Sequence, residues 1–497
     1  MRVSLMAAFV VMAAALDVSA QRATSPADSA WDAGDRNLAR RMYANEVAQR
    51  PTNSRATFRL AALTVDRHHA LTLYQRYTQL EPDDAWGWMA TGDHLARMGR
   101  IRDALAMYDR GARLRPGERD VVIGRARVLS RGGRADAAAA EYERRTAADP
   151  NDVEAWEGAG REWMRAGRPR HAIRGLERAV ALGSATAAAQ LRRARSAAAP
   201  DFEPSLAYSG DSDDNRLIRF GLHASGVVFD GARLGVVGLT SRIGDPATDR
   251  SIQEGYLSLS ARPRTTTQIT VRAGAARLDR VTSTPWVTPA VEMRLRWRDS
   301  PRGTIIELRG QRVPLGATPL LVENLAMRNE AGASLDVPLG PFRLRAGGRA
   351  GTIRTVSQAN SRWQARGAVA VPLAGAGEVS LQYHRLHFAQ SSTSGYFAPD
   401  QVEMVEAGTA AEFNAGAVSV AMDLGAGAQR VKQFGATIGP WALALRGWGS
   451  LAVPIARTAA VLLEAEAYDA PFAAAGVATT ANWKYISISV GLRIALR

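Results

Sequence analysis

The sequence predicts two architectures in series: an α-helical repeat solenoid, then an antiparallel transmembrane β-barrel of about 16 strands. Three observations predict them. A 34-residue period runs through residues 54–187, about 16 segments of alternating polarity fill residues 201–497, and tight turns alternate with longer polar breaks between those segments. Turns at one end and long loops at the other are typical of bacterial outer-membrane barrels, and an even strand number puts both barrel ends on the periplasmic, short-turn side.

The composition limits the possible domain number, cross-links and partners. The 497 residues have room for two or three domains. The chain has no cysteine, which excludes disulfides and thiolate metal sites. The net charge of +15 comes almost wholly from arginine. A basic chain can bind nucleic acid, but these arginines are spread over both architectures and no nucleic-acid motif accompanies them, so we expect no nucleic-acid partner.

Residues 1–20 read as a secretory signal peptide. A basic start, Met1-Arg2-Val3, precedes an apolar run from Leu5 to Leu16 and a small-residue end, Val18-Ser19-Ala20. We expect cleavage after Ala20. The run is too short to span a bilayer as a helix, and no later segment offers about 18 uncharged apolar residues. An exported chain without a helical anchor can still enter a membrane by closing a barrel.

The repeats recur at fixed offsets of 34 residues. The equivalent positions are Trp88, Val122 and Trp156; Gly92, Ala126 and Gly160; Gly99, Gly133 and Gly167; Tyr108, Tyr142 and Leu176; and Pro82, Pro116 and Pro150. This pattern resembles the tetratricopeptide repeat, in which two antiparallel helices form each unit. The domain is expected over residues 21–199, in the periplasm, with a boundary near Ala199–Phe202 and the barrel over 200–497.

The spacing has a physical reading. Small residues are expected where the two helices of a unit cross, glycines where a left-handed cap ends the first helix, and prolines where the second helix stops. Trp86, Trp88, Trp156 and Trp163 are interpreted as packing residues, although Trp86 stands at a position that can be exposed. The residues expected to pack the repeats are Trp88, Gly92, Tyr108, Pro116, Tyr142, Pro150, Trp156 and Gly160.

In the barrel segments, charge recurs on one strand face. Ile486, Ile488 and Val490 alternate with Ser487 and Ser489 in the last segment, and the apolar set must face lipid. A lumen of about 16 strands is wide enough to hold water. The candidate lumen residues are Arg272, Glu292, Arg294, Arg296, Glu307, Arg309, Arg343, Arg345, Arg349, Arg366 and Arg493. Two interpretations stay open: structural Arg–Glu ladders between strands, or a functional basic surface that attracts an anionic chain.

The order of leader, repeats and barrel resembles the outer-membrane exporters of secreted polysaccharides, with the cellulose synthase operon protein C family nearest. A local match is Gly395-Tyr396-Phe397-Ala398-Pro399-Asp400, which is similar to a Gly-Tyr-aromatic-Ser-Pro-Gln stretch of that family's barrel. The candidate motif residues are Gly395, Tyr396, Phe397 and Pro399. The chain departs from the family in its repeats: about four stand where family members usually carry many more.

The residues suggest no catalytic site. His68 and His69 are adjacent, His384 and His387 fall on opposite strand faces, and no nucleophile elbow or phosphate loop is present. We therefore expect neither an enzyme nor a cofactor or metal. The resemblance implies an export channel for an exopolysaccharide, cellulose-like or anionic, acting as a monomer in outer-membrane lipid, with repeats that dock synthase components. The alternatives are a translocator of surface lipoproteins, whose repeats bind a protein client, and a non-conducting barrel-anchored scaffold.

Overall fold

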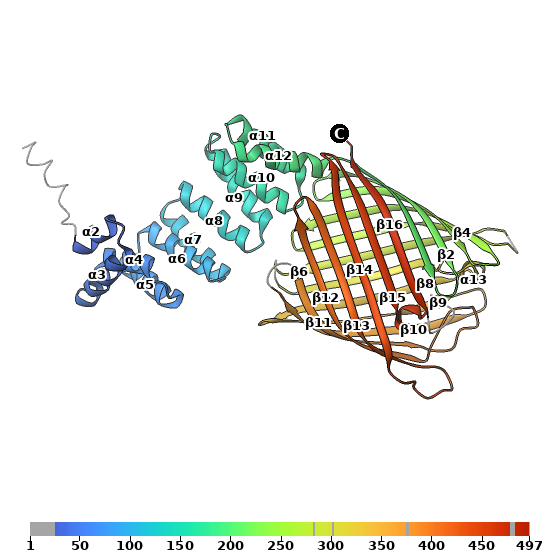
Figure 1. Ribbon diagram of the computed structural model, residues 1–497. Helices are drawn as coiled ribbons and strands as arrows, with labels where there is room; N and C mark the ends of the chain where they lie inside the picture. The colour runs from blue at the N-terminus through green and yellow to red at the C-terminus, as the bar shows by residue number, and fades with distance from the viewer. Residues whose placement is uncertain (1–24, 282–283, 301–302, 374–376, 478–482, 497) are drawn as a thin grey trace, which may run out of the picture. The chain divides into compact units, whose positions relative to one another are not determined.

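A computed structural model describes residues 25–281, 284–300, 303–373, 377–477 and 483–496 (Figure 1). The predicted signal peptide lies outside these residues. The chain divides into two compact units, one ending at Ala155 and one comprising Trp156–Arg497, and each is described by itself. No described helix is both long and apolar enough to cross a bilayer.

The N-terminal region consists of antiparallel helix pairs. Its helices are α2 (Pro26–Asp32), α3 (Arg36–Gln49), α4 (Ser54–Leu63), α5 (Arg67–Leu80), α6 (Ala85–Arg97), α7 (Ile101–Leu114), α8 (Arg119–Arg131), α9 (Ala135–Ala148), α10 (Val153–Arg165), α11 (Pro169–Ala181) and α12 (Ala185–Ala198). Helices α6, α8 and α10 begin 34 residues apart, so the period read from the sequence is that of the helix pairs.

The small consensus residues lie where large side chains cross. A Cβ on Gly92 would stand 2.9 Å from the Tyr108 ring and 3.1 Å from the carbonyl of Ala104. Tyr108 is buried, and its hydroxyl donates to Asp93 at 2.7 Å. Gly99 follows α6 with a φ of +80°, a conformation that glycine adopts without a Cβ penalty. The close crossing and the cap together fix the α6–α7 hairpin.

The other predicted packing residues take similar places. Tyr142 is buried like Tyr108, and a Cβ on Gly160 would meet the Leu176 side chain at 2.5 Å. Pro116 and Pro150 stand two residues beyond the last residues of α7 and α9. Trp88 is only half-buried and donates through Nε1 to the Pro82 carbonyl at 2.8 Å. Trp156 packs against the cluster of α11 and α12, and Trp86 is 45% exposed.

The C-terminal region is a closed antiparallel barrel of sixteen strands, which confirms the predicted fold class. The strands are β1 (Asp201–Asp211), β2 (Arg216–Phe229), β3 (Ala232–Gly244), β4 (Asp249–Arg264), β5 (Thr267–Asp279), β6 (Trp286–Arg298), β7 (Ile305–Pro314), β8 (Met327–Leu339), β9 (Phe342–Arg354), β10 (Ala359–Pro372), β11 (Gly377–Phe388), β12 (Gln401–Ala415), β13 (Val418–Lys432), β14 (Ala442–Ala456), β15 (Ala459–Asp469) and β16 (Lys484–Ala495). Each strand pairs with its sequence neighbours, and β16 pairs with β1 to close the sheet.

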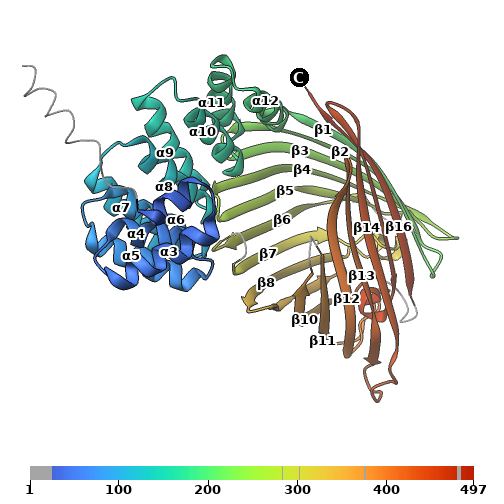
Figure 2. The same cartoon turned by 60° about the vertical axis from the view of Figure 1, so that its left-hand side comes forward.

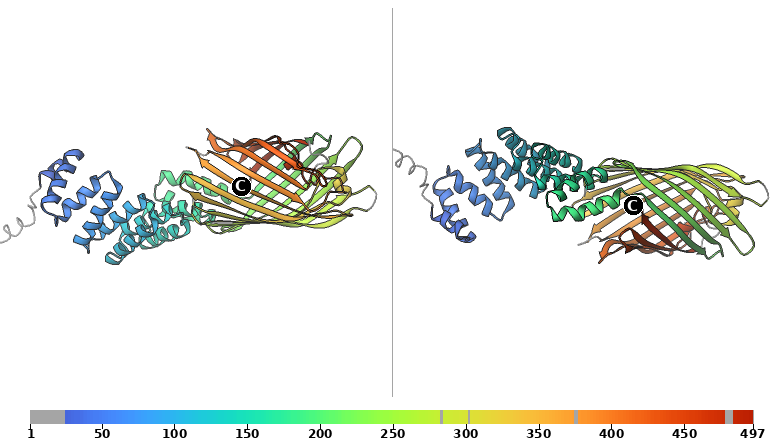
Figure 3. Two further views of the ribbon diagram at one scale, coloured as in Figure 1. Left: turned by 90° about the horizontal axis from the view of Figure 1, so that it is seen from below. Right: turned by 90° about the horizontal axis from the view of Figure 1, so that it is seen from above.

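Within the barrel, the strands run obliquely around a common axis (Figure 3). In Figure 2 the wall from β1 to β8 faces the wall from β10 to β16. Exposed apolar side chains follow the outward positions with period 2, as at Ile486, Ile488 and Val490 in β16 and at Val379 and Leu381 in β11. This alternation leaves the charged residues on the inward face.

Two short helices interrupt loops that the sequence analysis treats as polar breaks. Helix α13 (Pro319–Glu323) lies between β7 and β8, and α14 (Pro471–Ala474) lies between β15 and β16. Leu321 and Val322 of α13 are fully buried. Within these two longer breaks, short apolar runs therefore fold inward.

Candidate functional site: an arginine wall beneath a loop cap

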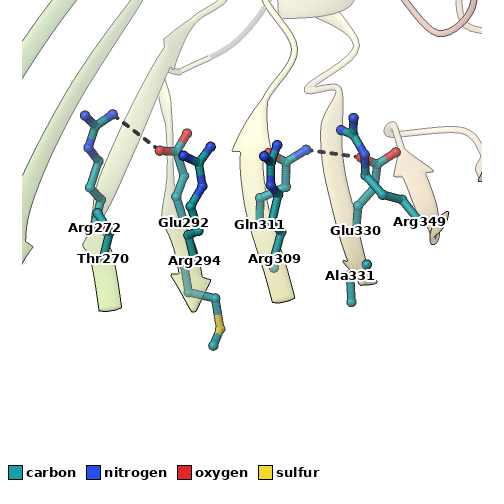
Figure 4. Close-up of a pocket in the computed structure, with 12 residues that line it drawn as sticks. Thr270, Arg272, Glu292, Arg294, Arg309, Gln311, Glu330, Ala331 and Arg349 are labelled. Carbon is teal, nitrogen blue, oxygen red and sulfur yellow. Dashed lines mark hydrogen bonds and ion pairs between the residues drawn. The ribbon is translucent and has the colours of Figure 1, made fainter. Parts of the chain in front are cut away.

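One side of the barrel interior is dominated by arginine. We give the name arginine wall to eight inward-facing arginines on strands between β5 and β10, namely Arg272, Arg294, Arg296, Arg309, Arg343, Arg345, Arg349 and Arg366. Figure 4 shows Arg272, Arg294, Arg309 and Arg349 rising from neighbouring strands on the same side of the sheet. The strand register explains the alignment, because Arg294 pairs directly with Arg309, Arg309 with Gly332, and Gly332 with Arg349.

Much of this wall is neutralised by carboxylates. Arg345 bonds Glu378 through two nitrogens at 2.5 and 2.6 Å, and its Nε donates to Asp336 at 3.1 Å. Arg343 donates to the same Asp336 at 2.8 Å. Cross-strand ladders of this kind stabilise a sheet. These contacts are those that the structural interpretation predicts for the two arginines.

The middle of the wall has fewer acids than arginines. Arg272 lies 3.4 Å from Glu292, a contact drawn in Figure 4. Glu307 is shared: Arg309 bonds it, and Arg294 lies 3.7 Å from it. One carboxylate therefore serves two guanidiniums.

Within the described part of the chain, Arg349 and Arg366 form no ion pair and no hydrogen bond, and both side chains are exposed to solvent. Each stands beside a glycine in the cross-strand register: Arg349 pairs with Gly332, and Arg366 with Gly347. Because glycine has no side chain, space is left beside each arginine. Cavities of about 300 and 100 Å³ flank Arg349, and the smaller one also borders Arg366.

A further cavity of about 380 Å³ shows that these residues face a common interior, because strands from β6 to β14 contribute to its lining. Its far side is acidic: Glu406 and Asp423 both bind Arg446, at 2.9 and 2.8 Å. His384 lies 3.7 Å from Glu406. Arginine thus predominates on one side of the interior and carboxylates on the other.

The predicted lumen residue Arg493 lies apart from the arginine wall. It belongs to β16 and donates to Glu203 of β1 at 2.8 Å, so it ties together the two strands that close the barrel. On the same face of β16 its neighbours are Gly491 and Ala495. Arg493 therefore lies at the barrel closure, outside the arginine wall.

The long-loop end of the barrel is covered by an apolar cluster that we call the loop cap. Its buried members are Leu315, Leu321, Ala326, Ile353, Leu386, Phe388, Tyr396, Ala398, Val402 and Ala475. They come from the inward faces of β9, β11 and β12 and from three loops, namely β7–β8, β11–β12 and β15–β16. Burying this area from water stabilises the loops in one arrangement.

The loops of the cap reach across the barrel end. Helix α13 contacts β4 and β5, while its Leu321 packs with Ile353 of β9 and Leu386 of β11. The N–H of Gly476, in the β15–β16 loop, donates to the carbonyl of Phe397 in the β11–β12 loop at 2.7 Å. Each of these loops joins two adjacent strands, but the contacts of α13 link β4 and β5 with β9 and β11. The cap therefore extends over the interior at this end.

The motif Gly395-Tyr396-Phe397-Ala398-Pro399 lies in this cap. Tyr396 is 4% exposed and its ring centroid lies 6.2 Å from that of Phe388. Gly395 has a φ of +81°, and a Cβ there would collide with Leu320. Pro399 follows the buried Ala398 just before β12. The motif residues therefore shape the cap and lie in a loop, outside the strands that carry the arginine wall.

Several interior residues lie outside the set of candidate lumen residues. Arg362 and Glu330 form a buried ion pair at 3.2 Å, with side chains 7% and 3% exposed. Arg446 and Glu406 were also absent from the candidates, although the inward period of β12 and β14 carries them. Among the described residues, no group of three His, Asp or Glu side chains is arranged to hold a metal ion.

Comparison with known protein families supports the helical repeats. The tetratricopeptide repeat family model matches residues 95–161, which confirms the predicted repeat type. No curated protein matches the sequence.

Among solved structures, a crystal structure of MamA is similar to 32% of this chain over 94% of its own length, with 19% identity and a TM-score of 0.30. YrrB, described as a tetratricopeptide-repeat protein with an unusual peptide-binding site, is similar over 34% of this chain and 88% of its own, with 15% identity and a TM-score of 0.30. A bacterial polysaccharide outer membrane secretin is similar over 60% of this chain and 99% of its own, with 9% identity and a TM-score of 0.45.

Proposed function

We propose that this protein is an outer-membrane export channel for a secreted polysaccharide, with its helical repeats in the periplasm. The single observation that carries the proposal is the closed sixteen-strand barrel with an apolar outer face and a charged, water-accessible interior. An outer face of this kind suits lipid, and a barrel of this size accommodates an aqueous path. The repeats are of a kind that usually binds proteins, and here they dock the synthesis machinery.

The orientation follows from strand parity. Helix α12 ends at Ala198 and β1 begins at Asp201, so the repeats join the barrel at the end where short turns connect the strands. In outer-membrane barrels that end faces the periplasm. The loop cap then lies at the cell surface, where it closes the path until a polymer is in transit.

The arrangement of the interior favours a long hydrophilic cargo. Serine, glutamine and charged side chains line the cavity between β6 and β14. Sugars bind through hydrogen bonds to such groups, and apolar cargo would leave them unpaired at a cost. A lipoprotein acyl chain has no apolar groove to follow among the residues that line this cavity, so we prefer polysaccharide over lipoprotein.

The proposal is tested by deleting the gene and measuring carbohydrate in the culture medium and in the periplasm. We expect the secreted polymer to fall to background while polymer accumulates in the periplasm. The wild-type gene should restore secretion, and a gene lacking residues 25–199 but keeping the leader and barrel should not. Unchanged secretion after deletion would refute an export role.

A further inference from the structure

Arg294, Arg309, Arg349 and Arg366 form one continuous basic surface, which we call the anion subsite. Arg294, Arg309 and Arg349 lie in one cross-strand row that Gly332 interrupts. Arg366 is a diagonal neighbour of Arg349, because Arg349 pairs with Gln364 two residues earlier. Diagonal neighbours on one sheet face lie roughly 7–8 Å apart, within reach of long side chains.

The charges of this surface are unbalanced. Glu307 is the carboxylate that Arg294 and Arg309 share, and Arg349 and Arg366 have none within the described residues. The neighbouring Glu330 is already engaged by Arg362 at 3.2 Å and by the side-chain amide of Gln311 at 3.1 Å. Among the described residues, the four guanidiniums therefore share one ion-paired carboxylate, whereas Glu292 and Glu330, which also line the cavity, pair with Arg272 and Arg362.

Like charges held together repel, and a bound anion would relieve that repulsion. The space for such a ligand is present, since the cavities of about 300 and 100 Å³ lie over Gly332 between Arg309 and Arg349. A side chain at residue 332 would fill this gap, because a Cβ there would stand 2.6 Å from the Arg349 Cγ. Glycine thus keeps the space between the two arginines open.

The use of arginine rather than lysine indicates the chemical class of the ligand. The chain has two lysines, Lys432 and Lys484, and both lie at strand ends beside the long loops. Only arginine serves the subsite. A guanidinium donates two parallel hydrogen bonds to a carboxylate or sulfate, whereas an ammonium acts as a point charge.

We propose that the anion subsite binds the oxyanion groups of an acidic polysaccharide, so that the exported polymer carries carboxylate or sulfate. This inference rests on the proposed export function and names its substrate class. The polymer's acid groups pair in turn with Arg349 and Arg366, while Arg294 and Arg309 keep the surface basic beside them. Contacts open to water are individually weak, so the chain can advance from one to the next.

The test is a binding titration on the full-length protein in detergent. The probes are a short oligogalacturonate, a sulfated oligosaccharide of equal length and a neutral cello-oligosaccharide. We expect the wild type to bind one or both acidic probes, more weakly as salt rises, and not the neutral probe. In the double variant Arg349→Gln/Arg366→Gln, the Kd for the bound acidic probe should rise by about tenfold or more, because two charge-assisted contacts are lost.

Two further variants separate the effect of net charge from the effect of the paired hydrogen-bond donors of Arg349 and Arg366. Arg216→Gln/Arg457→Gln removes the same charge from an outward position at a strand end and from a turn, and should leave the Kd unchanged. Arg349→Lys/Arg366→Lys keeps the charge but loses the paired donors, and should give an intermediate Kd. Heat-modifiable gel mobility verifies that each variant keeps a closed barrel.

Equal binding of acidic and neutral probes, or an unchanged Kd in the Arg349→Gln/Arg366→Gln variant, would overturn the inference and leave the export proposal standing. Conversely, if gene deletion leaves secretion unchanged while the wild type still selects acidic probes through these arginines, the export role fails and the anion subsite survives. The two failures are therefore distinguishable.

Discussion

Tyr108 couples two helix hairpins through its ring. One edge of the ring lies against Gly92 of α6, and the hydroxyl end lies against Gly124 of α8. The hydroxyl also donates to Asp93, and burial raises the pKa of Tyr108, so the side chain stays neutral and keeps donating. One aromatic residue therefore fixes the distance between consecutive units.

Replacing Gly92 by valine should destabilise the repeats by about 1–3 kcal/mol, because the branched side chain must displace the Tyr108 ring or the Ala104 carbonyl. Urea unfolding followed by helical circular dichroism measures the change. The matched control is Gly111→Ala in α7, where the added Cβ would meet its nearest atoms at an ordinary 3.5 Å. That variant should be neutral or more stable by up to about 1 kcal/mol. Equal effects of both would refute the packing argument.

Asp152 is a charged junction within the first unit. Its carboxylate accepts from Arg119 at 2.8 Å, Arg145 at 2.9 Å and the Ala155 N–H at 3.1 Å. Burial raises the pKa of Asp152, but the hydrogen bonds from Arg119, Arg145 and the Ala155 N–H, together with the charge of Arg119, outweigh it and hold the pKa below its ordinary range. The ionised form is therefore favoured by folding.

Asp152→Asn should lower the free energy of unfolding near neutral pH by about 1–3 kcal/mol. A depressed folded-state pKa contributes stability above the unfolded pKa of about 3.9, and that contribution is lost as the pH falls through the folded-state value. The difference between wild type and variant should therefore shrink below about pH 4. Denaturant titrations at neutral and acidic pH measure it, and a difference independent of pH would argue against the carboxylate's charge as the cause.

The sequence predicts individual residues unevenly. Period-2 alternation places Arg294, Arg345 and Arg349 on one face without any knowledge of the fold. The alternation does not predict the ion-pair partner of each arginine, because the partner depends on strand register. Arg345 donates to Glu378, whereas Arg349 lies opposite Gly332. The difference between a neutralised arginine and an unpaired one therefore appears only in three dimensions.

At the scale of elements, strands are predictable because each extended segment repeats one pattern, whereas the loop cap is not. Helix α13 has five residues and α14 four, too short for a helical period to show. The apolar Leu320-Leu321-Val322 run was the available signal. Its burial depends on partners such as Phe388 and Tyr396, which come from other loops and strands.

The cap can be locked to test whether it moves. The hydroxyl oxygens of Ser357 and Ser394 lie 3.1 Å apart and join the β9–β10 loop to the β11–β12 loop. Because the chain has no cysteine, Ser357→Cys/Ser394→Cys introduces a single possible disulfide at a separation that needs little adjustment. We expect polymer secretion to fall under oxidising conditions and to recover with reductant. The single variant Ser357→Cys should secrete normally, and unimpaired secretion by the oxidised double variant would mean that this part of the cap stays still.

At the scale of the whole molecule, the two faces of the barrel sheet suit different surroundings: the outer face is apolar and the inner face is polar. Leu381 is 61% exposed on the outer face, and the adjacent Ser380 lines the interior cavity. Leu381→Arg should cost about 2–4 kcal/mol if the residue lies near the middle of the bilayer. Ser380→Arg should fold almost normally.

The folded fraction of both variants is measured by heat-modifiable gel mobility after refolding into phospholipid vesicles. Similar yields for the two would contradict a lipid-facing outer surface. The same assay in detergent alone should narrow the difference, since small detergents adapt to a local charge.

The two-part architecture is the level best predicted from sequence, because both parts rest on repetition: 34 residues in the helices and two in the strands. The divide between compact units falls instead at Ala155, within the helical region. No periodic pattern could indicate this, since α10 repeats the spacing of α6 and α8. The division into compact units depends on which residues contact one another in three dimensions, whereas the repeat period depends only on the order of residues in the sequence.

The sheet is joined into a ring by β1 and β16, whose pairing runs from Asp201 opposite Ala495 to Asp211 opposite Tyr485. Without β16, β1 and β15 would each leave a row of unpaired N–H and C=O groups, to which another extended chain could add by hydrogen bonding. Shortening the chain by this one strand would therefore turn a sheet without edges into one with two sites for self-association.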